Sequence, residues 1–577
     1  MIEPITQFPM HWLFELAVIC TAFIWGRALV LLVDRRAIGW TVTPLGCVTY
    51  LLLGLWLLAI CGTVLRFYMP LKSALSLVTF AGISCTALLY VVNRDGSKFS
   101  SIIRSKQALI FSSALLILLP LGLGDWGFDA GLYHMTKAMH VAQTENITGL
   151  GLLKSYFATN PLTDILRGLG LAIYPSAISM YFINDVMMLI LVLYLLQLIF
   201  LEERKCYAWL GLTVFFSLWL MGGTENYFDR GIADFTATVA TSIAYISLYL
   251  VIFESRAPDR NIATENRYFT LGVVAVVFAV LTKLSTTPVA IGYIFYWLFL
   301  RTQPDKTWWQ SRRLGLFFFL PVTLSIITWL AFHKMVSGCW LYPIASTCDL
   351  HTGFHIIVDY DRLLIFLHSR VPGDYLDSTN QAIWWVHWWA KWKTSLILWG
   401  IVGGVLLTLV AFLIPIRNKQ QIQNSNLAGY VTVLLLLMHS VYWGYTAPDV
   451  RYANFLGLLW LGFGIYFVVT RHFSTRLQPI LSYLHRNHLV TLLLLPATTL
   501  LFLCNFNPIR VITPLPGIPE PTLLQMVTSS GMRFNYAIPD IRCWAAPLPC
   551  TLSLDPYWYD RLYYSDEEGF NLLPGDS

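Results

Sequence analysis

Charged residues are scarce in this sequence. Asp, Glu, Lys and Arg make up only 12% of the 577 residues, while 56% are hydrophobic and the mean hydropathy is +0.61. Soluble domains carry roughly 25% charged residues, so this composition excludes an ordinary soluble domain. We therefore expect a polytopic membrane protein.

Several chemical signatures are also absent. The sequence has no Gly-rich phosphate-binding loop, no Ser nucleophile elbow and no zinc signature, which argues against an ATP-driven pump. Residues Met1 to Pro9 lack a basic stretch, and the apolar run after them is long and ends at Arg35 and Arg36. No cleavable signal peptide is evident from this pattern, so we expect the first helix to be retained, with the N-terminus outside.

Long apolar runs fill most of the chain. Runs of about 17–22 residues predict membrane-spanning helices, and about fourteen such runs predict an all-α, polytopic transmembrane fold. They lie near residues 11–33, 45–67, 73–92, 107–124, 182–201, 207–222, 234–253, 268–282, 286–300, 314–333, 395–416, 428–445, 453–470 and 488–504. Pro288 interrupts the two short segments at 268–282 and 286–300, which could instead form one broken span or a re-entrant pair.

Basic residues predict the orientation of these spans. They concentrate in alternate loops, which begin near Arg35, Arg94, Arg204, Arg256, Arg301, Arg417 and Arg471. With fourteen spans these loops share one side, which the positive-inside rule makes cytoplasmic. This orientation explains the net charge of +6 better than a nucleic-acid partner does. The opposite, extracytoplasmic side then receives segments 125–181, 223–233, 334–394, 447–451 and 505–577.

Cysteines on the predicted outer side form two local pairs. Cys339 and Cys348 lie together in segment 334–394, and Cys543 and Cys550 lie together in the Pro- and aromatic-rich tail, which we expect to form a small ordered cap. Such pairs predict two disulfide bonds in an oxidising compartment. The alternative is four reduced thiols, and zinc is disfavoured because neither pair has a Cys-x₂-Cys spacing.

The segment after the fourth expected span concentrates polar groups. Asp125, Asp129, Tyr133 and His134 lie close together next to the hydrocarbon boundary, where an acid is costly unless it is solvated, paired or functional. If Asp129 opens a short helix, Tyr133 follows one turn later on the same face, with His134 beside it. The alternative is an ordinary interfacial loop whose carboxylates face water and whose His is structural.

Other ionisable residues of the predicted outer face could complete a site: Glu225, Asp229, Lys283, Asp449 and Arg451. Lys283 and Arg451 suit a lipid-linked phosphate, which Arg binds through a bidentate fork and Lys as a point charge. A carboxylate can take a proton from an attacking hydroxyl, and we take Asp129 as the candidate base and Asp125 as second choice. Snorkelling to the interface is the alternative for both cations.

Three further patterns have weaker implications. A divalent metal held by Asp129 with Glu225 or Asp229 is conceivable, but no spacing requires a metal or another cofactor. The tryptophans at 384–389 and 392 favour an interfacial aromatic belt over a sugar-stacking platform. Asn146-Ile-Thr148 is a glycosylation sequon that matters only in a eukaryotic secretory setting.

The order of several short motifs resembles a known group of proteins. The motifs are Asp129-Ala-Gly-Leu-Tyr-His134, Lys283-Leu-Ser, Ala447-Pro-Asp-Val-Arg451-Tyr452, the tail Cys543-Trp-Ala-Ala-Pro-Leu-Pro-Cys550, and Gly569-Phe570. They are similar to those of a bacterial family of membrane proteins like the GT-C superfamily of polytopic glycosyltransferases. That superfamily places a catalytic Asp in a large outer loop and uses sugars linked to polyprenyl phosphate. The resemblance implies that Asp129 is the catalytic acid of the loop and that Arg451 contacts phosphate.

The resemblance also implies a division of the chain. Residues 1–106 would be N-terminal helices additional to the usual pattern, and 107–333 a GT-C-like core with the catalytic outer loop 125–181. The long outer loop 334–394, the C-terminal helices 395–504 and the extracytoplasmic tail 505–577 would follow.

The predicted function is an inverting glycosyltransferase at the periplasmic face of a bacterial inner membrane. Its donor would be a polyprenyl-phosphate sugar, and its acceptor an envelope glycan, lipid or protein hydroxyl. One alternative is a surface-polysaccharide polymerase or ligase, which would not need the carboxylate at Asp129. Another is a non-enzymatic transporter of lipid-linked glycans, which predicts polar groups at mid-membrane depth and an internal repeat. A structural assembly component without chemistry is a third.

Overall fold

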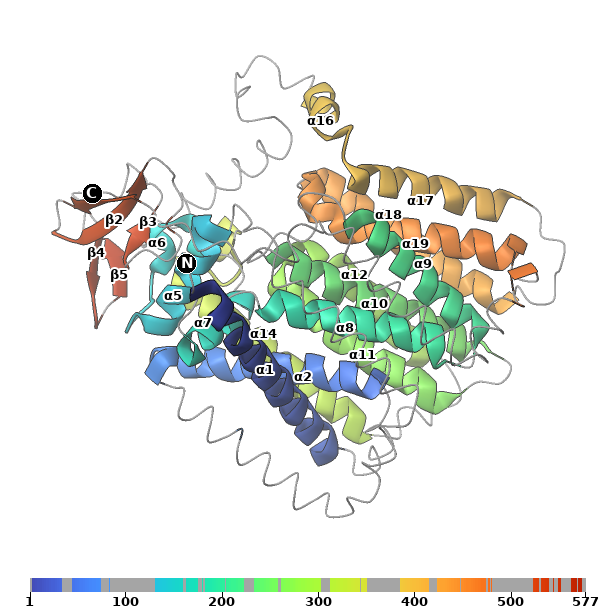
Figure 1. Ribbon diagram of the computed structural model, residues 1–577, viewed down its shortest axis with the longest axis horizontal. Coiled ribbons are helices and arrows are strands. Elements are labelled where there is room, and N and C mark those ends of the chain that lie inside the picture. Colours follow the sequence, from blue (N-terminus) through green and yellow to red (C-terminus); the bar gives the residue numbers. More distant parts are fainter. Residues whose placement is uncertain are drawn as a thin grey trace.

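We describe the chain from a computed structural model. It describes residues 3–33, 44–73, 130–158, 162–174, 182–202, 204–222, 233–257, 261–301, 312–342, 344–349, 384–414, 423–446, 448–473, 522–528, 531–538, 562–567 and 569–572, with a few single residues and short pieces between these ranges. Figure 1 shows the helices gathered in a bundle, with short helices and a small set of strands at one end.

Eight helices of the described ranges are long and apolar enough to cross a membrane. They are α1 (Glu3–Val33), α2 (Pro44–Arg66), α8 (Phe182–Phe200), α10 (Ala233–Ser255), α11 (Ile262–Thr282), α17 (Leu396–Leu413), α18 (Gln423–Thr446) and α19 (Asn454–Val468), the last with its flanking turns. Three further helices have shorter apolar stretches: α9 (Lys205–Gly222), α12 (Pro288–Arg301) and α14 (Arg312–Ser337). The mostly helical membrane fold is thus confirmed. The total of fourteen stays a prediction, because the spans expected near 73–92, 107–124 and 488–504 lie outside the described residues.

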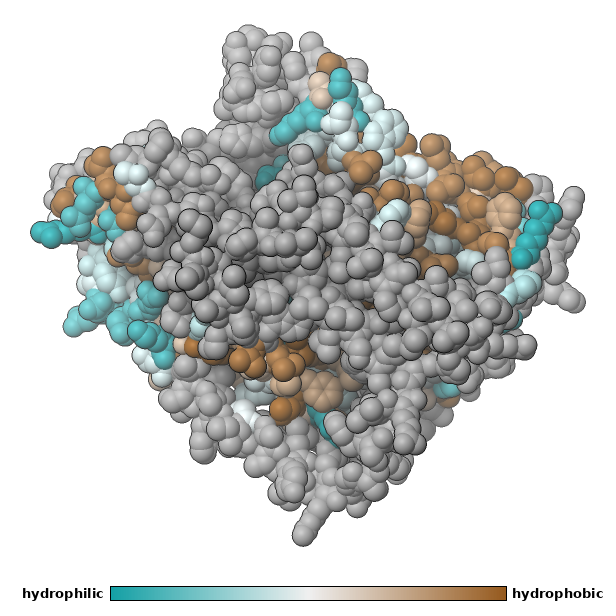
Figure 2. Space-filling model, in the orientation of Figure 1, coloured by the Kyte–Doolittle hydropathy of each residue, from teal (hydrophilic) through white to brown (hydrophobic). Residues whose placement is uncertain are grey.

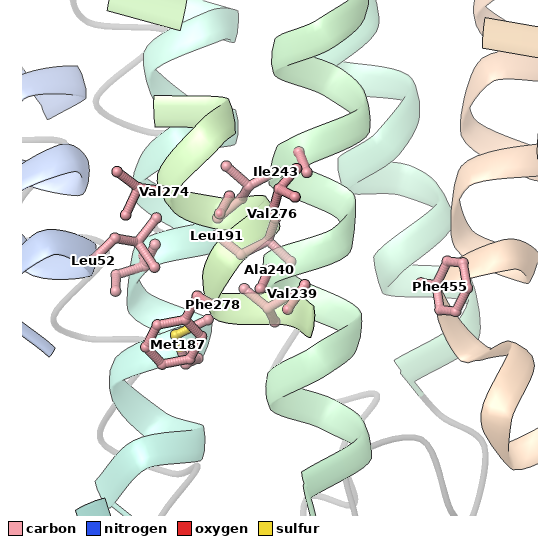
Figure 3. Packing of buried hydrophobic residues seen from close by; sticks show 14 of the residues in the cluster. Leu52, Met187, Leu191, Val239, Ala240, Ile243, Val274, Val276, Phe278 and Phe455 are labelled. Carbon is pink, nitrogen blue, oxygen red and sulfur yellow. The ribbon is translucent and has the colours of Figure 1, made fainter. Parts of the chain in front are cut away.

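The centre of the bundle is formed by α8, α10 and α11. The apolar windows of α8 and α10 are wholly buried, as expected for helices that are hydrophobic on all sides. In Figure 3, Met187 and Leu191 of α8 pack near Val239 and Ile243 of α10, with α2 and α11 beside them. By contrast, α17 and α18 expose large apolar side chains such as Leu413 and Val441, which lipid can cover. Figure 2 shows brown, hydrophobic surface at its upper right, where Figure 1 places α17.

Helices α1 and α2 cross at a pair of glycines. A Cβ atom on Gly26 would lie 1.9 Å from the carbonyl oxygen of Tyr50, and one on Gly54 would lie 1.7 Å from that of Ala22. Small residues let two membrane helices approach backbone to backbone, and dispersion contacts along the line of approach then stabilise the pair. This crossing joins the N-terminal helix to the rest of the bundle.

Helices α11 and α12 form an antiparallel hairpin. The turn Leu284–Thr286 joins them. Tyr293 of α12 fills the space at Gly272 of α11, and its hydroxyl donates to the carbonyl oxygen of Ala244, while the hydroxyl of Tyr296 donates to Glu265. Since α11 alone is long enough to span, the two segments do not make one broken span, and the Lys283 turn lies at one end of the bundle.

Several short helices follow Asp129 at the same end of the bundle (cyan in Figure 1). They are η3 (Ala130–His134), α5 (Met135–Gln143), α6 (Leu150–Leu153), η4 (Ser155–Ala158) and α7 (Leu162–Ile173). Gly149 precedes α6 with φ +67°. We call residues 130–173 the outer segment.

The C-terminal part is a small β structure. Strands β1 (Thr522–Val527), β2 (Arg533–Ile538) and β3 (Cys550–Thr551) form a sheet in that order, with β1–β2 antiparallel and β2–β3 parallel. Strands β4 (Leu562–Ser565) and β5 (Gly569–Leu572) form an antiparallel hairpin. The all-α prediction is therefore wrong for the tail, whose strands are too short for a clear period-two hydrophobic pattern. The expected ordered cap takes this form, and we call residues 522–572 the cap.

The cap docks on the outer segment through its backbone. The amide of Phe570 donates to the carbonyl oxygen of Thr148 at 2.8 Å, and the side-chain amide of Asn146 donates to the carbonyl oxygen of Glu567 at 2.8 Å. The Phe570 ring also meets that of His140 edge to face, with centroids 5.7 Å apart. Asn146 and Thr148 of the sequon therefore hold the cap in place.

Both predicted disulfide bonds are confirmed. Cys339 bonds to Cys348 just after α14, and Cys543 bonds to Cys550 within the cap. The second disulfide packs on Leu132, beside Tyr133 and Tyr156 of the outer segment. It thus forms part of the contact between the cap and the outer segment.

We predict that Gly149→Ala weakens cap docking. The new Cβ atom would lie 2.0 Å from the carbonyl oxygen of Phe570, on backbone already in the left-handed region. The left-handed conformation alone costs a non-Gly residue roughly 1–2 kcal/mol, and the displaced carbonyl adds to this cost. Hydrogen exchange at the Phe570 amide should accelerate strongly.

Gly531→Ala is the matched control for this prediction. Gly531 has φ +86°, but a Cβ atom there would meet nothing within 4 Å. The control should therefore show only the conformational cost and leave exchange at Phe570 nearly unchanged. Equal acceleration in both variants would contradict the proposed contact.

Candidate functional site

One carboxylate joins three short helices of the outer segment: η3, α5 and α7. Asp164 of α7 accepts from Nδ1 of His134 at 3.0 Å, pairs with Nζ of Lys137 at 3.0 Å and accepts from Nη1 of Arg167 at 3.0 Å. The side chains of Lys137, Asp164 and Arg167 have no exposed surface. We call His134, Lys137, Asp164 and Arg167 the Asp164 network.

Burial and pairing act in opposite directions on these groups. Burial by itself would raise the pKa of Asp164, but the charges of Lys137, His134 and Arg167 outweigh it and hold that pKa well below its usual range. Burial lowers the pKa of Lys137 and Arg167, and Asp164 counteracts the effect on both. The network is stable only as a unit, since removing one partner would leave a buried charge uncompensated.

Tyr133 connects this network to the cap. Its ring lies over that of His134, with centroids 4.2 Å apart, and beside that of Tyr156 at 5.3 Å. Tyr133 and Tyr156 also border the Cys543–Cys550 disulfide. The side chains that follow Asp129 in the chain are thus held by packing from two directions.

A second cluster lies at the ends of the spanning helices. Nζ of Lys283, in the turn after α11, forms an ion pair with Asp234 at the start of α10. The same ammonium lies 3.7 Å from the ring centroid of Tyr452, and the guanidinium carbon of Arg451 lies 5.8 Å from that centroid. Two cations far apart in the sequence therefore flank one aromatic ring. We call Asp234, Lys283, Asp449, Arg451 and Tyr452 the Lys283–Arg451 cluster.

The position of Arg451 is set by its neighbour Asp449. Its Nε donates to both carboxylate oxygens at 3.3 Å, and Nη2 donates to Oδ2 at 3.2 Å. Asp449 is mostly buried, whereas 37% of the Arg451 side chain is exposed. The carboxylate thus fixes the guanidinium while leaving part of it accessible.

Two indole groups hold the turn that carries Asp449. Nε1 of Trp443 donates to the carbonyl oxygen of Asp449 at 2.8 Å, and Nε1 of Trp388 donates to that of Pro448 at 2.5 Å. Trp388 belongs to α16 (Trp384–Trp392), while Trp389 of the same helix is 44% exposed. Helix α16 is therefore anchored to the turn through Trp388. The exposed ring of Trp389 is compatible with either an interfacial aromatic belt or a sugar-stacking platform.

The structure groups the predicted site residues in two sets. His134 and Tyr133 belong to the outer segment, and Lys283, Asp449 and Arg451 come together in the Lys283–Arg451 cluster. The predicted base Asp129, the second choice Asp125 and the acids Glu225 and Asp229 lie outside the described residues. The snorkelling interpretation does not suffice for Lys283, because its ammonium is paired with Asp234.

Sequence reasoning missed the centre of the outer segment. Lys137, Asp164 and Arg167 were not among the predicted residues, although all three are buried ionisable groups. The available signal was the i,i+3 pair Asp164 and Arg167 on a helix next to the membrane. Only the fold could show that Lys137 shares this carboxylate.

The described residues contain no group of three or more His, Cys, Asp and Glu side chains that could hold a metal ion. The carboxylates considered for a divalent cation, Asp129, Glu225 and Asp229, fall in parts of the chain that the structure does not describe. The described part of the site offers mainly paired cations, which suit an anionic ligand.

Comparison with known families gives a match over most of the chain. The family described as "Domain of unknown function (DUF8201)" matches residues 11–460. The chain belongs to this family. The matched range includes the Asp164 network and the Lys283–Arg451 cluster and ends within α19, before the cap. No curated protein and no solved structure matches the chain.

We predict that Asp164→Asn destabilises the outer segment strongly. The change leaves Lys137 and Arg167 buried without their shared carboxylate, and breaking a buried pair in this way costs about 3–5 kcal/mol. Hydrogen exchange across residues 130–173 and the melting temperature of the purified protein would measure the loss.

Asp449→Asn is a suitable comparison. Its partner Arg451 is partly exposed, so water can compensate the lost pair and a smaller loss, confined to residues 448–454, is expected. If Asp164→Asn proved as mild as Asp449→Asn, the Asp164 network would not hold the outer segment together.

Proposed function

We propose that this chain is a membrane glycosyltransferase that moves a sugar from a polyprenyl-phosphate donor to a cell-envelope acceptor. The reaction would take place at the extracytoplasmic face of a bacterial inner membrane. One observation supports it above the others: Lys283 and Arg451 flank the ring of Tyr452 at one end of a membrane bundle. The resemblance of the motifs to GT-C glycosyltransferases adds to this support.

The Lys283–Arg451 cluster suits the phosphate of a lipid-linked donor. Asp234 and Asp449 hold the two cations in place before a substrate arrives, so little side-chain ordering remains to be done on binding. Arg451 would form directed hydrogen bonds to phosphate oxygens and Lys283 would act as a point charge. Both would stabilise the negative charge that develops on the leaving phosphate.

Asp129 is the proposed base. Its carboxylate would take the proton of the acceptor hydroxyl while that oxygen attacks the anomeric carbon of the sugar. The bond from the anomeric carbon to the phosphate oxygen would break, and polyprenyl phosphate would leave with the electron pair. Attack from the face opposite the leaving group inverts the anomeric centre. Asp129 directly precedes η3, the first described element of the outer segment.

The distribution of charge favours this proposal over a transporter. A transporter for lipid-linked glycans would carry its polar groups near mid-membrane depth. Among the described residues, the Asp164 network lies in the short helices of the outer segment, and the Lys283–Arg451 cluster lies in turns at helix ends.

We predict that Asp129→Asn abolishes sugar transfer while insertion in the membrane stays normal. The amide has the shape of the carboxylate but cannot accept the proton, and loss of a general base costs typically 10²–10⁴-fold in rate. Purified protein would be incubated with radiolabelled polyprenyl-phosphate sugars and a crude envelope acceptor, and label in the acceptor counted.

Asp125→Asn is the matched control, because it removes a carboxylate four positions earlier in the same segment. It should retain most of the transfer. Full transfer by Asp129→Asn would refute the role of Asp129, and transfer lost only in Asp125→Asn would assign the base to that residue. Donor binding without transfer, equal in wild type and variants, would indicate a transporter or an accessory protein.

A further inference from the structure

Arg167 has two buried donors for which the described residues supply no hydrogen-bond partner. The side chain is fully buried, and its Nη1 donates to Oδ1 of Asp164 at 3.0 Å. Its Nε and Nη2 are buried too, and neither has a hydrogen-bond partner in the part of the chain that the structure describes. A buried guanidinium with two unused donors is unusual, because protein interiors satisfy nearly all such groups.

The two unused donors are arranged for an oxyanion. The N–H groups of Nε and Nη2 point the same way from a planar guanidinium, so that they match two oxygens of one phosphate or carboxylate. Arg451 uses the same edge, Nε and Nη2, to bind the carboxylate of Asp449. At Arg167 no described residue accepts from the corresponding edge.

Among the described residues, the side chains that contact Asp164 beside Arg167 are basic. Asp164 supplies one negative charge, which it shares among Arg167, Lys137 and the imidazole of His134. Tyr133 is near enough to Arg167 to interact with it electrostatically. An anion bound at this edge would be attracted to the guanidinium of Arg167 in a place shielded from water, where electrostatic interactions are strong.

Other buried donors for which the described residues supply no partner lie on α5, α7 and α14. They are the hydroxyls of Thr136 and Thr163, and the imidazole of His333 on α14, on which the charge of Lys137 acts. Hydroxyl and imidazole N–H groups are donors that commonly complete the coordination of a phosphate. These helices thus contain several buried donors besides the Nε–Nη2 edge of Arg167.

We propose that the Asp164 network is a phosphate-binding site in which the Nε–Nη2 edge of Arg167 makes the bidentate contact. It is distinct from the Lys283–Arg451 cluster and does not require that the chain transfers sugar. The ligand is a phosphate monoester or inorganic phosphate, and its source is either the headgroup of a lipid or the solution.

The test uses the full-length protein in phosphatidylcholine nanodiscs. Binding of inorganic phosphate and of a short-chain polyprenyl phosphate is measured separately by titration, with the uncharged polyprenol as the control ligand. The variants are Arg167→Lys, which keeps the charge but lacks the bidentate edge, and Arg451→Lys, the same change in the other cluster. A melting curve for each variant verifies folding.

We expect Arg167→Lys to weaken the binding of inorganic phosphate, of polyprenyl phosphate or of both, tenfold or more. Arg451→Lys should leave this binding site intact. Loss for polyprenyl phosphate alone identifies a lipid headgroup, and loss for both identifies a site for phosphate from either source. Unchanged binding in Arg167→Lys, or no saturable phosphate binding by the wild type, overturns the proposal. Loss of binding only in Arg451→Lys overturns it too, while leaving the proposed function standing.

A measurement on the wild type covers the case in which Arg167→Lys does not fold. Saturating phosphate should slow hydrogen exchange in peptides from residues 130–143 and 162–173, which carry the network. The absence of such protection would equally refute the site.

Discussion

The carboxylate of Asp164 is the interaction on which the outer end of this protein depends. It is buried, and three basic side chains from η3, α5 and α7 converge on it. In a chain with so few charges, buried ionisable groups persist only when each finds a partner. Because His134 and Lys137 follow shortly after Asp129, this carboxylate also determines where the described segment next to the proposed base lies.

The cap and the bundle both act on the same segment. Helix α14 reaches it through the carbonyl oxygen of Met335, which accepts from the amide of Gly149, and the cap reaches it through Phe570 and Asn146. A disulfide of the cap packs on Leu132. The cap lies beyond the residues that the family model matches, yet it helps to hold the outer segment in place. Disturbing the cap should therefore disturb the proposed catalytic region.

Hydropathy and residue spacing predicted much of this architecture. The lengths of the apolar runs predicted the spanning helices among the described residues, and the short spacing of the cysteines predicted both disulfides. Both kinds of feature can be predicted because each depends only on a short stretch of sequence. Lys283 and Arg451 were predicted as outer cations, but their meeting at Tyr452 depends on the packing of α18 and α19 against α10 and α12. The Asp164 network and the β cap were missed for related reasons: Lys137 finds Asp164 only after α5 packs on α7, and cap strands of two to six residues carry little periodicity.

The central claim is that the Lys283–Arg451 cluster receives a polyprenyl phosphate. Photo-crosslinking tests it most directly, with a polyprenyl phosphate that carries a diazirine on the isoprenoid unit next to the phosphate. Peptides of the crosslinked protein are then identified by mass spectrometry. The account predicts saturable labelling of peptides around Lys283 and Tyr452, displaced by excess unlabelled polyprenyl phosphate and not by polyprenol. Labelling confined to the lipid-facing surfaces of α17 and α18, or displaced equally by polyprenol, would contradict it.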